Sequence, residues 1–267
     1  MQAITVKELK QIQLDLLAAI DTFCRKNNIK YSIAFGTLLG QVRHGGYIPW
    51  DDDIDIMMPR ADYDRFLKEF QSEFYKVIDF DTDNSYSQPY AKVYDSRTKL
   101  DEFTNTKNKY GINIDIFPLD KVPVDIQRNS WFLREKKFYN LLHTFKIVRL
   151  VGNMKLKTKM VVSIAKLFMV GIRTETINKK LISLSKKYQN LSDYKIGIIA
   201  PTDNRYEEIF SKEVFESYED CKFENLTVKR IVRYHEYLQH SYGDYMQLPP
   251  EEKRISHHAF YAVWIDS

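Results

Sequence analysis

The side chains best suited to chemistry in this sequence are four aspartates within five positions: Asp51, Asp52, Asp53 and Asp55. Successive side chains of a strand point to opposite faces, so Asp53 and Asp55 would share one face. Ile54 and Ile56 would then point into the core. Two carboxylates on one face raise each other's pKa unless a cation lies between them. Mg²⁺ or Mn²⁺, which favour carboxylate and phosphate oxygens, are the ions expected there. The spacing therefore indicates a metal site for phosphate chemistry.

A glycine-containing turn, Gly36-Thr37, precedes the aspartates by about seventeen residues. Because glycine has no Cβ, backbone N–H groups of this turn could approach a phosphate closely. The competing interpretation is a solvated acidic turn in which one aspartate caps the chain. The isoleucines behind Asp53 and Asp55 favour the metal site, and Asp51 and Asp52 fit the pattern less well.

Phosphoryl transfer also needs positive charge against the phosphate oxygens. Basic residues follow the turn or stand further along the chain, and each could instead be an exposed residue that balances the aspartates. The expected substrate-binding residues are Gly36, Thr37, Arg43, His44, Lys92 and Arg97. Trp50 is expected to pack as core rather than to stack on a base. Adjacent His257 and His258 cannot both face one ion from regular structure and are left outside the site.

The motifs together resemble one family. A Gly-Thr turn followed by Asp-x-Asp resembles the nucleotidyltransferase superfamily, in which the turn contacts phosphate and the aspartates hold Mg²⁺. Four longer strings resemble its LicD family: GTLLG with Arg43, PWDDDID at 49–55, IDIFPLD at 114–120, and YGDYM with the later PP and KR at 242–254. The resemblance covers residues 27–120 closely and 205–258 more loosely, and it leaves 126–200 unmatched.

The resemblance also assigns a third carboxylate. Such sites draw an acid from a neighbouring strand, and in IDIFPLD Asp115 is the residue that shares a face with Asn113 while the isoleucines share the other. Asp115 could complete the metal shell or take a proton from the acceptor hydroxyl, and it could also be a solvent-facing strand residue. The expected catalytic and metal residues are therefore Asp53, Asp55 and Asp115. Asp120, beyond Pro118, is expected to be structural.

The resemblance implies an α+β fold, a nucleotidyltransferase-like mixed sheet flanked by helices with a helical insertion. The chain is expected to divide into a catalytic core at 1–125, a basic helical subdomain at 126–200 and a C-terminal part at 201–267. The implied reaction moves phosphocholine or a similar phospho-alcohol from a CDP-activated donor to a sugar hydroxyl of a glycan such as teichoic acid or lipopolysaccharide, and CMP leaves. The alternatives are a true nucleotidyltransferase that releases pyrophosphate and a non-catalytic membrane-surface scaffold.

Hydrophobic periodicity places the elements that would hold these residues. Helices are expected at about 6–26, 37–42, 62–74, 126–150, 156–172, 175–190 and 227–242. Strands are expected at 31–35, 54–58, 90–94 and 112–117. Thr5 and Glu8 have the spacing of a capping box before the first helix.

The composition is that of a folded globular protein, with 44% hydrophobic and 28% charged residues and a net charge of +4. This charge is too small to indicate nucleic acid, and no nucleic-acid partner is expected. Cys24 and Cys221 give no disulfide framework. Without a signal peptide or a long apolar run, the expected location is cytoplasmic, with the inner face of the plasma membrane as a possible site of attachment.

The residues from 136 to 174 carry nine lysines and arginines and no acidic residue. Apolar residues at helical spacing lie among them. A cationic amphipathic helix of this kind docks at an anionic membrane surface, where it would meet a lipid-linked glycan acceptor. The competing interpretation is a core helix flanked by solvated lysines.

Overall fold

The computed structural model describes residues 2–101, 110–150, 154–199, 209–254 and 261–265. Its centre is a mixed sheet in the strand order β1-β2-β6-β4-β3. The bounds are β1 Ser32–Ile33, β2 Asp55–Pro59, β6 Asn113–Val122, β4 Ala91–Asp95 and β3 Tyr75–Ile78. Strands β2 and β6 run parallel and the other pairs are antiparallel. The far end of β6 pairs with β7 (Lys195–Gly197), which pairs with β8 (Ile209–Phe210).

The first three helices pack around this sheet and match their expected positions closely. Helix α1 (Val6–Lys26) contacts β4 and β6, α2 (Phe35–His44) contacts β2, and α3 (Arg60–Glu69) contacts β2 and β6. The expected capping box starts α1, since the Thr5 hydroxyl accepts from the Glu8 N–H at 3.3 Å and the Glu8 carboxylate accepts from the Thr5 N–H at 2.8 Å. Helix α3 ends five residues before the expected boundary, and the chain then enters β3.

The last quarter of the chain differs most from expectation. The residues expected to open a helix at 227 form strand β10 (Leu226–Ile231), paired with β9 (Tyr218–Phe223), and helix α7 begins only at Tyr234 and ends at Tyr242. Thr227, Val228 and Ile231 are β-branched and favour a strand. Pairing along the whole of β9 outweighs the helical spacing of the apolar residues.

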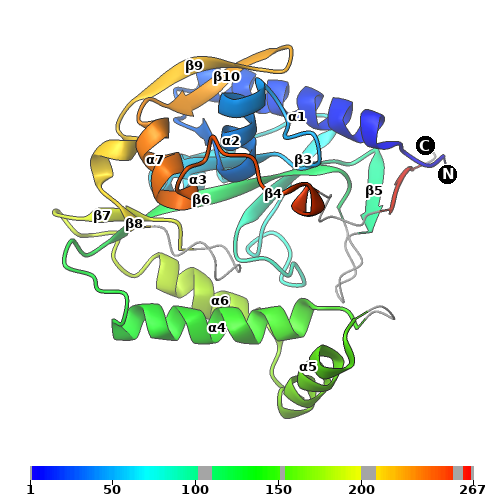
Figure 1. Cartoon of the computed structure of the whole chain (residues 1–267), viewed down its shortest axis with the longest axis vertical. Coiled ribbons are helices and arrows are strands. Elements are labelled where there is room, and N and C mark those ends of the chain that lie inside the picture. The colour runs from blue at the N-terminus through cyan, green and yellow to red at the C-terminus, as the bar shows by residue number, and fades with distance from the viewer. Residues whose placement is uncertain (1, 102–109, 151–153, 200–208, 255–260, 266–267) are drawn as a thin grey trace.

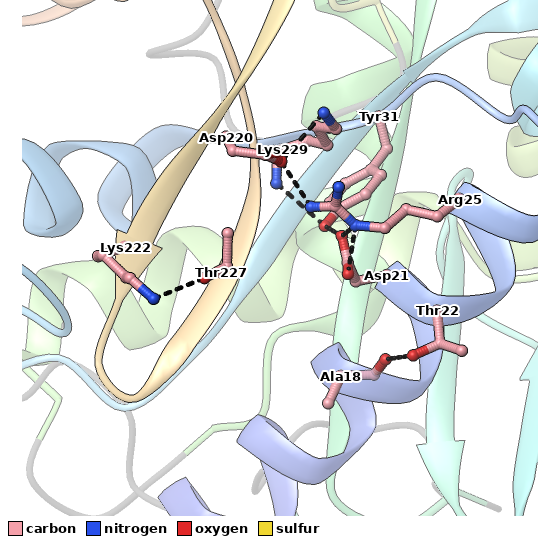
Figure 2. A network of polar contacts seen from close by, with 9 residues as sticks. All are labelled: Ala18, Asp21, Thr22, Arg25, Tyr31, Asp220, Lys222, Thr227 and Lys229. Carbon is pink, nitrogen blue, oxygen red and sulfur yellow. Dashed lines mark hydrogen bonds and ion pairs between the residues drawn. The ribbon is translucent and has the colours of Figure 1, made fainter.

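A polar network fastens this hairpin to α1 (Figure 2). The Arg25 guanidinium donates to Asp21 on its own helix at 2.7 Å and to Asp220 of β9 at 2.6 Å. Lys229 of β10 pairs with Asp220 at 3.0 Å, and the Tyr31 hydroxyl donates to Asp21 at 2.6 Å. The C-terminal hairpin is thus tied to the first helix across nearly the whole sequence.

Three helices form a separate layer beneath the sheet in Figure 1: α4 (Trp131–Ile147), α5 (Leu156–Phe168) and α6 (Thr174–Ser185). Each is shorter than expected from the sequence but lies at the expected place. Helices α4 and α6 pack together, and α5 projects furthest from the sheet. This layer supports the loop before β4, because His143 of α4 bonds the Ser87 carbonyl and Asn178 of α6 donates to the Tyr86 carbonyl at 3.1 Å.

The two ends of the described chain lie together (Figure 1). The Ile4 N–H donates to the Ala262 carbonyl at 2.9 Å, and the Trp264 N–H donates to the Gln2 carbonyl at 3.0 Å. Strand β11 (Tyr261–Trp264) also pairs with β5 (Thr98–Asp101). Two short 3₁₀ turns, Lys212–Phe215 and Glu251–Lys253, complete the described elements. None of the described helices has the length and apolar character needed to cross a bilayer.

Candidate active site

Three charged residues stand side by side on the central strands. In the sheet register Asp55 of β2 lies opposite Asp115 of β6, and Asp115 lies opposite Lys92 of β4. The Lys92 ammonium donates to the Asp115 carboxylate and, at 3.0 Å, to the Asn113 side-chain oxygen. Lys92 is only 4% exposed, so its charge is held within this row. The structure thus brings together Asp55, Asp115 and Lys92.

The aspartate run leads directly into this row. The alternating pattern predicts Asp53 and Asp55 within one strand. Strand β2 begins at Asp55, however, so Asp53 lies before the strand. The burial pattern still alternates, because Ile54 and Ile56 are 1% and 0% exposed whereas Asp53 and Asp55 keep partial exposure. Burial raises the pKa of Asp55 well above its usual value, and the charges of Asp53, Asp115 and Asp51 raise it further, while Lys92 lowers it. The carboxylates are therefore close enough to repel one another.

The Gly-Thr turn forms the start of α2 and touches the aspartates. The Asp55 N–H donates to the Thr37 hydroxyl at 2.8 Å, and Thr37 is 3% exposed, so this side chain positions Asp55. A Cβ on Gly36 would lie 2.8 Å from the Asp51 carboxylate, so the missing side chain lets this carboxylate lie against the start of α2. Phe35, just before the turn, has φ +43°, a conformation that costs energy for a bulky residue and is common at functional sites.

Arginine side chains gather where the C-terminal segment crosses α2. The Arg43 guanidinium donates to the Tyr245 carbonyl at 3.1 Å and to the His44 ring at 3.0 Å. The His44 ring packs edge-on against Trp50, and the Arg254 guanidinium lies 5.9 Å from the Trp50 ring centre. Burial lowers the pKa of Arg43, and the positive charge of Arg254 lowers it further. Two cations therefore stand near each other around His44 and Trp50, and Trp50 directly precedes the aspartate run in the sequence.

The candidate site thus includes a residue that the sequence reasoning did not assign. Arg254 belongs to the KR string at 253–254, which enters the sequence analysis only as part of the family resemblance. The occurrence of this string after YGDYM is the sequence signal that indicates Arg254. Trp50 packs partly into the main core, as expected, and also contacts both His44 and Arg254.

The turn of the β9–β10 hairpin holds the loop that leads from α2 to the aspartates. The Glu224 N–H donates to the Gly45 carbonyl, and the Glu224 carboxylate accepts from the Tyr47 N–H, each at 3.0 Å. A second glycine of the GTLLG string lets α2 pack closely against the same loop, since a Cβ on Gly40 would lie 2.4 Å from the Gly46 carbonyl. The β9–β10 turn and the start of the loop that follows α2 are therefore held together although they lie far apart in the sequence.

Two other charged residues have their contacts elsewhere. The Arg97 guanidinium pairs with Asp95 at 2.6 Å and packs over the Phe74 ring, so the structure does not bring it into the row of Asp55, Asp115 and Lys92. Asp120 is fully buried and accepts two hydrogen bonds from Arg60, at 2.7 and 2.9 Å, in keeping with the expected structural role. His257 and His258 lie outside the described residues.

The donor set at this site suits a hard divalent cation. Carboxylate oxygens of Asp53, Asp55 and Asp115 are the ligands that Mg²⁺ and Mn²⁺ favour. Burial and then the neighbouring carboxylates raise the pKa of Asp55, so a positive charge there would stabilise its ionised form. Among the described residues, however, no three acidic, histidine or cysteine side chains converge as they stand into a ready ligand cage. The Lys92 ammonium already lies on Asp115. Binding a cation would require these side chains to turn toward one point.

Comparison with known proteins identifies the class. Residues 28–149 match the model of the family described as LicD/FKTN/FKRP, nucleotidyltransferase domain. This range contains the Gly-Thr turn, the aspartates and the row on β2, β6 and β4. This match, together with a relative aligned along nearly the whole chain, supports membership in the LicD family.

Individual relatives extend the match along the chain. The lipopolysaccharide cholinephosphotransferase LicD of Haemophilus influenzae is 28% identical over 279 aligned residues, which cover 97% of this chain and 97% of that protein. An uncharacterized protein of Rickettsia prowazekii is 40% identical over 102 residues, 37% of this chain and 35% of its own length. A second one, of Rickettsia typhi, is 41% identical over 76 residues, 27% of this chain and 25% of its own length.

Proposed function

We propose that this protein transfers phosphocholine, or a closely similar phospho-alcohol, from a CDP-activated donor to a sugar hydroxyl of a cell-surface glycan. The observation that carries the proposal is the row of Asp55, Asp115 and Lys92. These two carboxylates and one ammonium lie opposite one another in register on the adjacent strands β2, β6 and β4. The relative from Haemophilus influenzae, matched over 97% of both chains, acts on lipopolysaccharide by its name. A lipopolysaccharide or teichoic acid precursor is therefore the acceptor class we propose.

The chemistry follows from the charges. The acceptor hydroxyl attacks the distal phosphorus in line and CMP leaves, so negative charge develops on the phosphoryl oxygens and on the leaving phosphate. Asp115 would take the hydroxyl proton or bind a cation, and its bond to Lys92 fixes the carboxylate in place. Arg43 and Arg254 would bind the phosphates of the donor, because their two positive charges lie near each other and Arg254 lies over Trp50, the residue that precedes the aspartates.

The proposed cofactor is Mg²⁺ or Mn²⁺, held by Asp53 and Asp55 with Asp115 as the third carboxylate. A bound divalent cation would offset the charge of the donor diphosphate. Thr37 supports this arrangement, since its hydroxyl accepts a hydrogen bond from the Asp55 N–H and so positions Asp55. We further propose that the reaction takes place on the cytoplasmic side of the inner membrane, where lipid-linked glycan precursors would be presented.

The test is product analysis with a panel of donors. The purified full chain is incubated with CDP-choline, CDP-ethanolamine, CDP-ribitol or CDP-glycerol, with Mg²⁺ or Mn²⁺, and with or without a lipopolysaccharide or teichoic acid acceptor. We expect CMP release that depends on the acceptor and on one of the donors. The Asp53→Asn/Asp55→Asn double variant should release no CMP while remaining folded, and Asp15→Asn, an exposed change on α1, should behave as the wild type.

The second candidate is a true nucleotidyltransferase, which the description of the matching family domain favours. The two reactions differ in the phosphorus attacked and in the leaving group. Pyrophosphate release from CTP or another nucleoside triphosphate, together with no CMP release from any CDP-alcohol, would replace the first proposal with the second. Full transfer activity in the double variant would refute the role given to the aspartates in both.

A further inference from the structure

Helix α5 presents an apolar stripe to solvent. The side chains of Leu156, Met160, Ile164 and Leu167 are 80, 60, 49 and 71% exposed, and that of Phe168 is 82% exposed. A helix turns about 100° per residue, so positions 156, 160, 164 and 167 fall on one side. The stripe is therefore continuous along the helix and not a scatter of single exposed residues.

The side of α5 that packs on the protein is the opposite one. Val162 is the buried residue of this helix, at 5% exposure, and it stands two residues, or about 200°, from Met160. Two lysines tie the C-terminal ends of α4 and α5 to each other. Lys166 of α5 donates to the Val148 carbonyl at 2.6 Å, and Lys146 of α4 donates to the Met169 carbonyl at 2.8 Å. The stripe thus faces solvent, because α5 packs on the protein through the opposite side. Helix α5 is therefore not a core helix.

The charge around the stripe selects its partner. Residues 136–174 contain nine basic and no acidic residues. Of these, Lys136 is buried in α4, whereas Lys155 and Lys157 are exposed at the start of α5. A second copy of this chain docked on the same face would bring like charges together, which costs energy. A surface that combines negative charge with an apolar interior satisfies both the lysines and the stripe.

We propose that α5 is a membrane-docking helix that inserts its apolar stripe at the surface of an anionic phospholipid bilayer and places Lys155 and Lys157 among the headgroups. Helix α5 is the described element furthest from the sheet, so it can reach a bilayer before the rest of the molecule does (Figure 1). Helix α4 adds exposed apolar side chains opposite its own buried ones, among them Trp131 at 76% and Phe138 at 56%. This inference does not depend on the proposed reaction, since docking needs neither donor nor acceptor.

Vesicle sedimentation tests the proposal with the full chain. We expect the protein to sediment with vesicles of equimolar phosphatidylcholine and phosphatidylglycerol and to stay in solution with vesicles of phosphatidylcholine alone. High salt should weaken binding, because the headgroup attraction is screened. The Leu167→Ser/Phe168→Ser variant should lose at least about tenfold in partitioning, and Lys155→Gln/Lys157→Gln should lose about fivefold per lysine.

The matched control replaces one exposed apolar residue and one exposed lysine on α1, away from α5. Val6 is 53% exposed and Lys7 is exposed, both on α1, so Val6→Ser/Lys7→Gln should leave vesicle binding unchanged. Thermal unfolding of every variant should match the wild type, since all these side chains lie in solvent. Failure of the wild type to sediment, or equal sedimentation of the stripe variant and the control, would overturn the proposal.

A second readout does not rely on loss of binding. Cys24 and Cys221 are buried and burial raises the pKa of both thiols, so an introduced exposed cysteine can be labelled selectively. An environment-sensitive dye on Leu167→Cys should shift to the blue with anionic vesicles only, and the same dye on Lys7→Cys should not shift. If ultracentrifugation instead finds a wild-type dimer that Leu167→Ser/Phe168→Ser converts to monomers, the stripe is a self-association surface and the membrane proposal is wrong.

Discussion

Replacing Asp55 by asparagine should stabilise the metal-free protein while abolishing its response to metal. Neighbouring strands lie ~4.8 Å apart, and two unit charges at that separation repel by about 3–4 kcal/mol at an effective dielectric constant of about 20. Asp55 and Asp115 occupy such neighbouring positions. Lys92 and the partial solvent exposure of both carboxyls offset part of this repulsion, which leaves an expected gain of about 1–2 kcal/mol for the variant.

The pH dependence of this gain follows from the pKa of Asp55. Burial and the neighbouring carboxylates raise that pKa above its value in the unfolded chain. The wild-type carboxyl therefore favours the folded state fully at acidic pH, below the unfolded pKa, and this contribution is lost as pH rises through the folded pKa. Asparagine does not titrate, so the difference in stability between Asp55→Asn and wild type should vanish at acidic pH and grow toward neutral pH.

Thermal unfolding in a chelator and in Mg²⁺ measures both effects. In the chelator at neutral pH, Asp55→Asn should unfold about 2–8 °C above wild type, at about 2–4 °C per kcal/mol for a chain of this size. Added Mg²⁺ should raise the melting temperature of the wild type by mass action and leave that of the variant unchanged. Asp15→Asn, an exposed control on α1, should change neither value. A lower melting temperature for Asp55→Asn in the chelator, or the absence of any wild-type response to Mg²⁺, would refute the reasoning.

Three further changes separate the roles assigned to neighbouring residues. Thr37→Val removes the acceptor for the Asp55 N–H and should lower CMP release by about tenfold or more, whereas Thr37→Ser keeps the hydroxyl and most of the rate. Arg254→Gln should raise the KM for the CDP-activated donor, and Arg254→Lys should restore part of the loss; an unchanged KM in steady-state kinetics would exclude Arg254 from the donor site. Asp120→Asn leaves the Arg60 guanidinium with only the exposed carboxylate of Asp64 and should lower the free energy of unfolding by about 3–5 kcal/mol, measured by urea titration, with no direct effect on the site.

The sequence predicted the centre of this protein better than its edges. The isoleucines of IDIFPLD and of the aspartate run define strands by strict alternation, and Ile56, Ile114 and Ile116 are all fully buried. Because the side-chain period of a strand is two, this pattern also gave the faces of Asp55 and Asp115 correctly relative to the isoleucines. The helices at 6–26, 156–172 and 175–190 were likewise found from their periodicity.

Contacts between distant segments could not be read in the same way. The apolar residues of 227–242 fit helical spacing and predict a helix, and only pairing with β9 decides that the first five of these residues form strand β10. Arg254 reaches Trp50 across about two hundred residues of sequence. Nothing local in either segment specifies that contact, so the sequence could indicate both motifs but not that they meet.

The first and last described residues lie side by side, so the course of the chain returns to the place where it starts. Because Gln2 and Trp264 are joined by a backbone hydrogen bond, a short linker could connect the termini without disturbing a strand. New ends could open at Gly171, which lies exposed with φ +89° in the turn between α5 and α6. In such a circular permutant each strand would keep its neighbours, and α5 would become the last helix of the polypeptide. The order in which the motifs leave the ribosome is thus separable from the surface that they build together.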